Sequence, residues 1–134
     1  MLIHKYPKIN IDGYDPAIKE FSVIPQNHYD MIINTDVLEH IPKSDIGDVV
    51  NHIKSLSNNI FFCLHHGKAW TILPNGENAH ITIEPKEWYH NLMKKYFDII
   101  IPLNARNPIN SIVITFNINK KIFNKYNKNI KIRY

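Results

Sequence analysis

The chain has 134 residues, a length that suits one domain with a single core, and 44% of them are hydrophobic. The formal charge is +4, but six of the 16 Lys and Arg residues lie in residues 119–134, so residues 1–118 carry ten basic against 12 acidic side chains. This balance argues against a nucleic-acid binder. No apolar run approaches the roughly 18 residues of a membrane span, and the start lacks the apolar stretch of a signal peptide. We therefore expect a cytoplasmic protein.

Residues 119–134, NKKIFNKYNKNIKIRY, form a basic tail after a domain that we place at residues 1–118. Such a tail can contact phosphate or an acidic partner. The alternative is that its Asn, Lys and Ile reflect only an AT-rich coding sequence. The single cysteine, Cys63, excludes an internal disulfide and is predicted to be a small core residue.

Short β-branched runs alternate with helical patterns, which is typical of an α/β domain. The sequence predicts a short strand over residues 8–12, a short helix from Pro16 to about residue 21, and a buried strand over residues 29–35. Ser44 then caps a helix. The apolar residues of that helix recur at the spacing of one face: Ile46, Val49, Val50, Ile53 and Leu56.

The second half of the chain continues the alternation. Residues 60–64 are the next buried strand, and the loop over residues 65–84 is long enough to suggest a function. Pro85 opens a helix that should turn three side chains toward the core: Trp88, Leu92 and Tyr96. Two last strands, with a connection that fits a hairpin, are predicted over residues 98–103 and 111–118.

Polar side chains follow three predicted strands at the same end of the sheet, where ligands bind in open α/β folds. They are Asp15, the segment DVLEH over residues 36–40, and the pair His65-His66. His40 is a candidate general base because its ordinary pKa suits the removal of a proton from a hydroxyl group. The candidate catalytic residues are His40, Glu39, Asp36 and His80.

The stretches IDGYDP, HYDMIINTDVLEHIP and NNIFFCLHHG, with the hairpin after them, resemble the second, fourth, fifth, sixth and seventh strands of class I S-adenosylmethionine-dependent methyltransferases. The resemblance covers nearly all of the chain except the tail. It implies a Rossmann-like three-layer fold, mostly parallel with a C-terminal antiparallel hairpin, and S-adenosylmethionine as cofactor. The family's first strand ends in a D-x-G-x-G-x-G turn, which none of the four glycines here forms. The resemblance is therefore to a truncated form without the first strand.

In this family the residue that matches Asp15 accepts hydrogen bonds from the ribose hydroxyls of the cofactor. The alternative is that Asp15 caps the turn beside Pro16. Asp36 matches a position at the methionine end of the cofactor. The segment of residues 36–40 also resembles the acidic-x-x-Glu-His segment of ubiquinone-biosynthesis O-methyltransferases, which can hold a divalent cation. Two carboxylates and one imidazole are an incomplete ligand set, and contacts of Asp36 and Glu39 with nearby backbone amides remain the plainer alternative.

The long loop contains LPNGENAH and leads into PKEW. Both resemble segments of methyltransferase-like proteins encoded near sugar and surface-polysaccharide genes, where they would cover the acceptor site. The predicted substrate-binding residues are His65, His66, Asn78 and Trp88. A core position for Trp88 is the alternative, and the histidines His65, His66 and His80 match no strong zinc spacing.

Three hypotheses follow. The first is a divergent methyltransferase acting on a small hydroxylated acceptor, such as a sugar or nucleotide sugar. The second is another small-molecule activity on the same scaffold, such as metal-assisted nucleotide hydrolysis. The third is a noncatalytic partner subunit of a methyltransferase. A missing strand leaves unpaired strand edges, which must be closed in some way. Three alternatives stay open: residues 8–12 pair directly with residues 29–35, a homo-oligomer or a partner chain completes the sheet, or the chain is an incomplete gene product.

Overall fold

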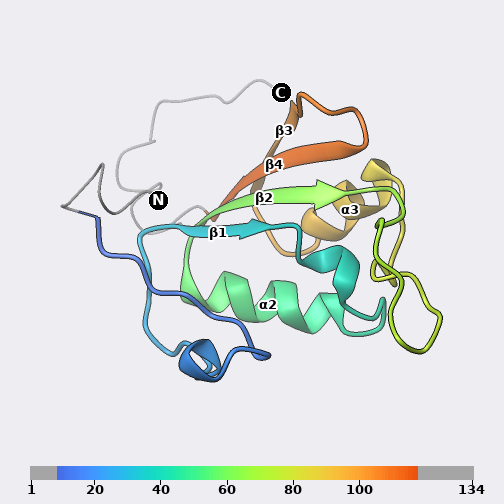
Figure 1. The fold of residues 1–134 in the computed structure, drawn as a ribbon. Coiled ribbons are helices and arrows are strands. Elements are labelled where there is room, and N and C mark those ends of the chain that lie inside the picture. Colours follow the sequence, from blue (N-terminus) through green and yellow to red (C-terminus); the bar gives the residue numbers. More distant parts are fainter. Residues whose placement is uncertain (1–8, 118–134) are drawn as a thin grey trace, which may run out of the picture.

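The computed structural model describes residues 9–117 (Figure 1). The basic tail and the start of the first predicted strand lie outside the described residues. Two α-helices and two short 3-10 helices are present in this part of the chain: η1 (Lys19–Phe21), η2 (Leu38–His40), α2 (Ile46–Leu56) and α3 (Lys86–Met93). The strands are β1 (Ile32–Thr35), β2 (Asn59–His65), β3 (Ile99–Asn104) and β4 (Asn110–Phe116).

The four strands form one mixed sheet in the order β1-β2-β4-β3. β1 runs parallel to β2, while β4 is antiparallel to both β2 and β3. The predicted C-terminal hairpin is therefore confirmed. The expectation of a mostly parallel sheet is wrong for the described residues, because the hairpin places β4 between β2 and β3 and makes two of the three pairings antiparallel.

The core lies on one face of the sheet, and both α-helices pack there. In β2, alternate side chains point to this face, so Ile60, Phe62 and Leu64 are buried. Helix α2 and the segment beginning with α3 contribute further side chains to the same cluster: Ile46, Val50, Ile53, Tyr89, Met93 and Phe97. Figure 1 shows α2 below the sheet. Over residues 9–117 the fold thus has two layers, which corrects the expected three-layer arrangement.

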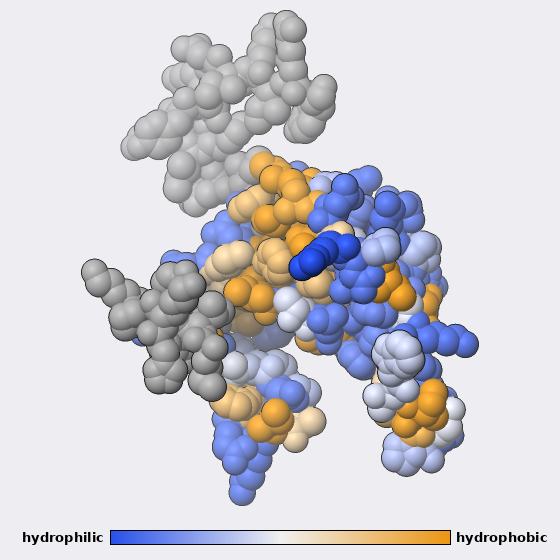
Figure 2. All heavy atoms as spheres, turned by 45° about the horizontal axis from the view of Figure 1, so that its top comes forward, coloured by the Kyte–Doolittle hydropathy of each residue, from blue (hydrophilic) through white to orange (hydrophobic). Residues whose placement is uncertain are grey.

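The opposite face of the sheet is apolar and carries no helix of the described residues. Its side chains include Ile33, which is 62% exposed, and Leu103, which is 45% exposed. Figure 2 shows apolar side chains gathered on the face of the molecule that it presents. Since a packed sheet of this kind is normally covered wherever it is apolar, this face is a candidate contact surface.

The segment before β1 departs from the prediction. Residues 9–12 form no strand, and the helix expected from Pro16 is only the turn η1. The apolar residues there find no partner, since Ile9 and Ile11 each remain 50% exposed. Of the strand predicted over residues 29–35, only Ile32–Thr35 pairs, because Tyr29 instead donates its backbone N–H to the carbonyl of Leu56 at 2.8 Å.

Both predicted α-helices are confirmed, with corrections at their ends and faces. Ser44 does not cap α2, because its hydroxyl donates to the carboxylate of Asp45 at 2.6 Å. In α3 the most buried side chains are Tyr89 and Met93, while the predicted core residues Trp88 and Leu92 are only partly buried. The third, Tyr96, is also partly buried and lies beyond the end of the helix at Met93. No helix among residues 9–117 is long and apolar enough to span a membrane.

Candidate functional site

The end of β1 begins the candidate site. Asp36 has a φ of 52°, a left-handed conformation that few L-residues adopt and that Asp tolerates better than most. Its backbone N–H still donates to the carbonyl of Cys63 at 3.1 Å, so the chain leaves the sheet beside the end of β2. The turn η2 follows at once. It buries Leu38 and Glu39 and leaves His40 exposed.

Glu39 is the unusual member of this turn. Its side chain is 0% exposed, and neither carboxylate oxygen has a hydrogen-bond partner among the described residues. Burial raises the pKa of the Glu39 carboxyl and the nearby charge of Asp36 adds to the rise, while the backbone N–H of Glu39 itself, His80 and His40 oppose the shift. A buried carboxyl group without partners is costly, and it needs an explanation in the function or the assembly of the protein.

The loop after β2 folds back on itself. Ile72 and Asn78 form a bridge, with Gly76 at the turn in the left-handed region, at a φ of 86°. Glycine suits this position because it has no Cβ. The Asn78 amide fixes the base of the loop, since its Oδ1 accepts from the N–H groups of Ala69 (2.9 Å) and His80 (3.0 Å) and its Nδ2 donates to the Ala69 carbonyl. The fold of the loop therefore returns His80 toward the sheet.

The end of the loop is anchored to η2, which brings His80 beside His40. Thr82 donates its backbone N–H to the carbonyl of Glu39 at 3.0 Å and its hydroxyl to the carbonyl of Ile41 at 2.7 Å. The ring centroids of His40 and His80 are 4.7 Å apart. His65, the last residue of β2, packs against His80 from another direction, with centroids 4.6 Å apart.

Hydrogen bonds to backbone carbonyls define which nitrogens these histidines leave free. Nδ1 of His40 lies 2.9 Å from the carbonyl oxygen of Ala79, and Nδ1 of His80 lies 2.6 Å from that of Gly67. A carbonyl only accepts, so both Nδ1 atoms carry the proton and donate it. In the neutral rings, Nε2 of His40 and Nε2 of His80 are then lone-pair donors for a proton or a metal ion.

The predicted site residues fall into two groups. Asp36, Glu39, His40, His65 and His80 follow β1 and β2 or lie on the returning loop. Asp15 lies on the N-terminal segment instead, where its Oδ1 accepts the backbone N–H of Ala17 at 2.9 Å. This bond is the capping contact that was the alternative prediction for Asp15. It uses Oδ1 and does not involve the second carboxylate oxygen.

His66 faces away from His65, since neighbouring residues at a strand end point to opposite sides. Its Nδ1 donates to the carbonyl of Glu84 at 3.1 Å, and its Nε2 accepts from the hydroxyl of Ser111 at 2.7 Å. The ring also packs against Tyr89. Burial lowers the pKa of His66, which agrees with a neutral ring that joins the loop to β4.

Trp88 and Trp70 offer two aromatic surfaces near the loop. Trp88 is partly buried, packs edge-on against Tyr89, and carries the Lys43 ammonium 5.3 Å from its ring centroid. Lys43 also pairs with Glu84 at 2.6 Å. Trp70 is fully exposed, and the sequence reasoning gave it no role, although a bare tryptophan on a functional loop is itself a signal for ligand contact.

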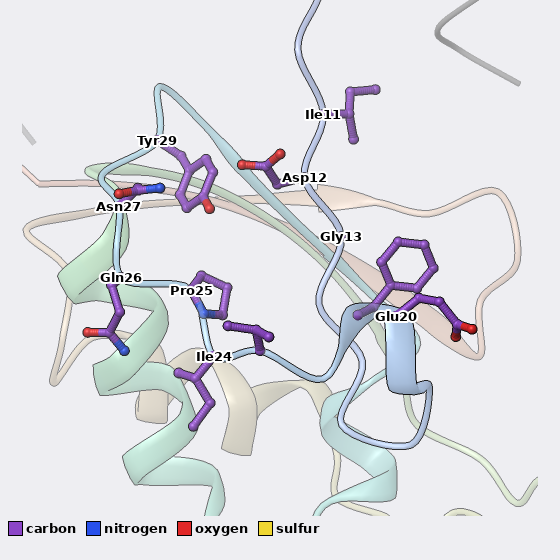
Figure 3. Close-up of a pocket in the computed structure, with 11 residues that line it drawn as sticks. Ile11, Asp12, Gly13, Glu20, Ile24, Pro25, Gln26, Asn27 and Tyr29 are labelled. Carbon is purple, nitrogen blue, oxygen red and sulfur yellow. The ribbon is translucent and has the colours of Figure 1, made fainter.

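Two surface cavities are lined by residues other than His40, His65 and His80. One, of about 460 Å³, lies between the N-terminal segment and the stretch that enters β1, where Asp12, Ile24 and Tyr29 line it (Figure 3). The other, of about 490 Å³, lies between α3 and the β3–β4 connection. None of the predicted site residues lines either of these two cavities. The first has the size of a small-molecule site.

Comparison with known proteins finds solved structures that share the fold of this chain. No protein-family model and no curated protein matches the chain. An O-methyltransferase family protein from Burkholderia thailandensis matches with a TM-score of 0.53 and 10% identity, over 68% of this chain and 31% of that one. The N-terminal domain of EvdMO1, solved with SAH bound, matches with a TM-score of 0.50 and 11% identity, over 69% of this chain and 48% of that one.

At these identities the likeness shows the fold alone. The chain has an α/β fold of the kind found in S-adenosylmethionine-dependent methyltransferases, as the sequence resemblance implied. It spans less than half of the length of the two structures that it matches.

Proposed function

We propose that the chain is a methyltransferase component that binds S-adenosylmethionine and methylates a small hydroxylated acceptor, such as a sugar or nucleotide sugar. The observation that carries this proposal is the shared fold, which extends over 68–69% of the chain in both matching structures, one of them with SAH bound. Part of the candidate set supports it, because five of these residues lie at the carboxyl ends of β1 and β2, where ligands of open α/β sheets bind, or on the loop that returns there: Asp36, Glu39, His40, His65 and His80.

His40 is the residue we assign as general base. It is exposed, its Nδ1 is fixed by the carbonyl of Ala79, and its Nε2 can accept a proton. Bound S-adenosylmethionine supplies an electrophilic methyl group on its sulfonium sulfur. Nε2 of His40 would take the proton of the acceptor hydroxyl as that oxygen accepts the methyl group, with S-adenosylhomocysteine as the second product. His65, His66, Asn78 and Trp88 stay predictions for the acceptor side, with His80 beside the base.

Cofactor contacts are assigned to Asp15 and Asp36. The Asp15 carboxylate is half-buried and uses one oxygen for the Ala17 N–H, so the other can accept from a ribose hydroxyl. Asp36 is exposed at the strand end, in a left-handed conformation of the kind that often accompanies function. Among residues 9–117 there is no glycine-rich turn after a strand, so we expect binding to be weak until further backbone contacts are supplied.

We infer that a partner chain, or a second copy, supplies those contacts. The two sheet edges differ: β3 carries Pro102, which blocks pairing, whereas β1 presents the residues IINT with no proline or charge. The edge formed by β1 can therefore pair with a further strand. The apolar face beside it, which includes Ile33, would be covered by the same partner.

Calorimetric titration of the full chain with S-adenosylmethionine and SAH tests the proposal. We expect measurable binding that is lost in Asp15→Ala and Asp36→Ala and kept in Asp30→Ala. Asp30 is the matched control, because it is exposed at the opposite end of the β1 segment. Absence of heat with either ligand, for a chain shown to be folded by circular dichroism, would refute cofactor binding by the chain itself.

A second candidate function is metal-assisted hydrolysis of a nucleotide or similar small molecule. The cluster of Glu39, His40 and His80 favours it, since one possible ligand atom from each lies within 4.8 Å of the others. This function requires hydrolysis that depends on the metal and is indifferent to S-adenosylmethionine. A noncatalytic subunit, the third hypothesis, would keep its function in His40→Ala.

A further inference from the structure

We propose that Glu39, His40 and His80 form a binding site for one divalent transition-metal ion such as Zn²⁺. The ligands are the Glu39 carboxylate and Nε2 of each histidine. The site is argued from these three side chains and their hydrogen bonds alone. It is an alternative to the general-base role assigned to His40 above, because a nitrogen that binds a metal has no lone pair left to accept a proton.

The fold brings the three groups together from two distant segments. Glu39 and His40 lie on η2, and His80 arrives from the loop whose base is fixed by the Asn78 amide. One possible ligand atom from each of the three residues lies within 4.8 Å of the others. A tetrahedral zinc ion holds its nitrogen and oxygen ligands roughly 3.4 Å apart, so the three groups have to move closer together when the ion binds.

The hydrogen bonds of the two histidines match those of metal ligands. A histidine that binds a metal through one nitrogen commonly donates the other N–H to a carbonyl or carboxylate, which fixes the ring and its tautomer. Nδ1 of His40 and Nδ1 of His80 make such bonds, to Ala79 and Gly67 respectively. Two rings from different segments are therefore oriented with the same nitrogen free.

Glu39 is an independent observation that points to a cation. Its side chain is fully buried, both its oxygens lack a hydrogen-bond partner, and the residues that approach it include His40 and His80. Protonation would neutralise the group but would still leave a buried hydroxyl without an acceptor. A metal ion supplies both the missing charge and the missing bond.

The donor set indicates the class of metal. Two imidazoles and one carboxylate suit zinc and other first-row transition ions, whereas Mg²⁺ and Ca²⁺ prefer oxygen ligands alone. Three protein ligands leave a position open, as in catalytic rather than structural zinc sites. His40 is exposed, so its side of the cluster borders solvent, from which a water molecule can reach an ion held there.

The test uses the full chain, freed of metal with a chelator and titrated with Zn²⁺, and with Co²⁺ for its visible absorption. We expect one ion per chain. Affinity should fall at least 10-fold in His80→Ala and in His40→Ala, and it should be unchanged in the control His28→Ala, which removes an exposed histidine from the N-terminal segment. His40 is exposed, so its replacement tests the site even if a change at buried Glu39 prevents folding.

Two results would overturn the proposal. One is a folded wild-type chain with no saturable binding of Zn²⁺ or Co²⁺. The other is binding that is equally strong in His40→Ala and His80→Ala, which would assign it to surface histidines. Neither measurement contains S-adenosylmethionine, so a failure of the metal site is distinct from a failure of the proposed function.

Discussion

Replacement of His66 tests whether this residue joins the loop to the sheet. In His66→Ala the Ser111 hydroxyl and the Glu84 carbonyl both lose their partner in the ring, and Ser111 is only 5% exposed. An unsatisfied buried group costs about 1–3 kcal/mol. Because Glu84 is partly open to water, its carbonyl can regain a partner from solvent. We therefore expect a loss of about 2–3 kcal/mol in the free energy of unfolding.

The same residue predicts a pH dependence. Burial lowers the pKa of His66 below its ordinary 6.5 in the folded chain. The unfolded chain then binds the proton more readily, so stability is full above about pH 6.5 and is lost as the pH falls through the folded pKa. Each unit of depression corresponds to about 1.4 kcal/mol. Burial also lowers the pKa of His90, which adds to the loss of stability as the pH falls.

Urea denaturation between pH 5 and pH 8 measures both effects. His66→Gln is the matched variant, because it keeps a polar group near Ser111 but cannot titrate. It should lose less stability than His66→Ala and should show a shallower decline toward pH 5 than the wild type. An unfolding free energy of His66→Ala within about 0.5 kcal/mol of the wild type would refute the role assigned to this histidine.

Three further predictions concern other parts of the molecule. In the metal-free chain, Glu39→Gln should raise the free energy of unfolding at neutral pH by about 1 kcal/mol, measured in urea with chelator present, because it removes a buried charge; a loss of stability would show that Glu39 has a partner. Ile33→Lys should leave stability within about 0.5 kcal/mol but weaken any self-association seen by sedimentation velocity. Unchanged association would exclude this face as the interface between copies. Gly76→Ala should cost about 1 kcal/mol by urea denaturation, since Gly76 has a φ of 86°; no change would mean that the loop opens before the chain unfolds.

The sequence predicted the elements whose apolar residues recur at a regular spacing, and the strands that pair with a neighbour close along the chain. Helix α2 and strand β2 follow from such spacing, and the hairpin follows from two β-branched runs with a short connection. Residues 9–12 have the alternation of a strand, yet a strand also needs a neighbour to accept its hydrogen bonds. The sequence does not reveal whether that neighbour exists, and the structure describes none.

The candidate site was predictable in position but not in its contacts. The clustering of polar residues after β1 and β2 follows from the parallel pairing of these strands. The opposite orientations of His65 and His66 could have been inferred from strand periodicity. The buried, unpartnered state of Glu39 could not, because it depends on how the loop over residues 66–85 packs against η2.

Strand β4 provides the clearest argument that the described fold is not the whole assembly. A strand with one solvated face places its polar residues outward. In β4 the order is reversed: Ser111, Val113 and Thr115 point into the core. The opposite face, which no helix of residues 9–117 covers, presents Ile112, Ile114 and Phe116. Paired beside it, β3 adds Ile99, Ile101 and Leu103 to the same face. Such a pattern is typical of strands buried on both faces. The sequence of the strands thus requires that another segment or chain cover the apolar face opposite α2 and α3. The edge strand β1 borders that face, so a partner that pairs with β1 could cover the apolar face as well.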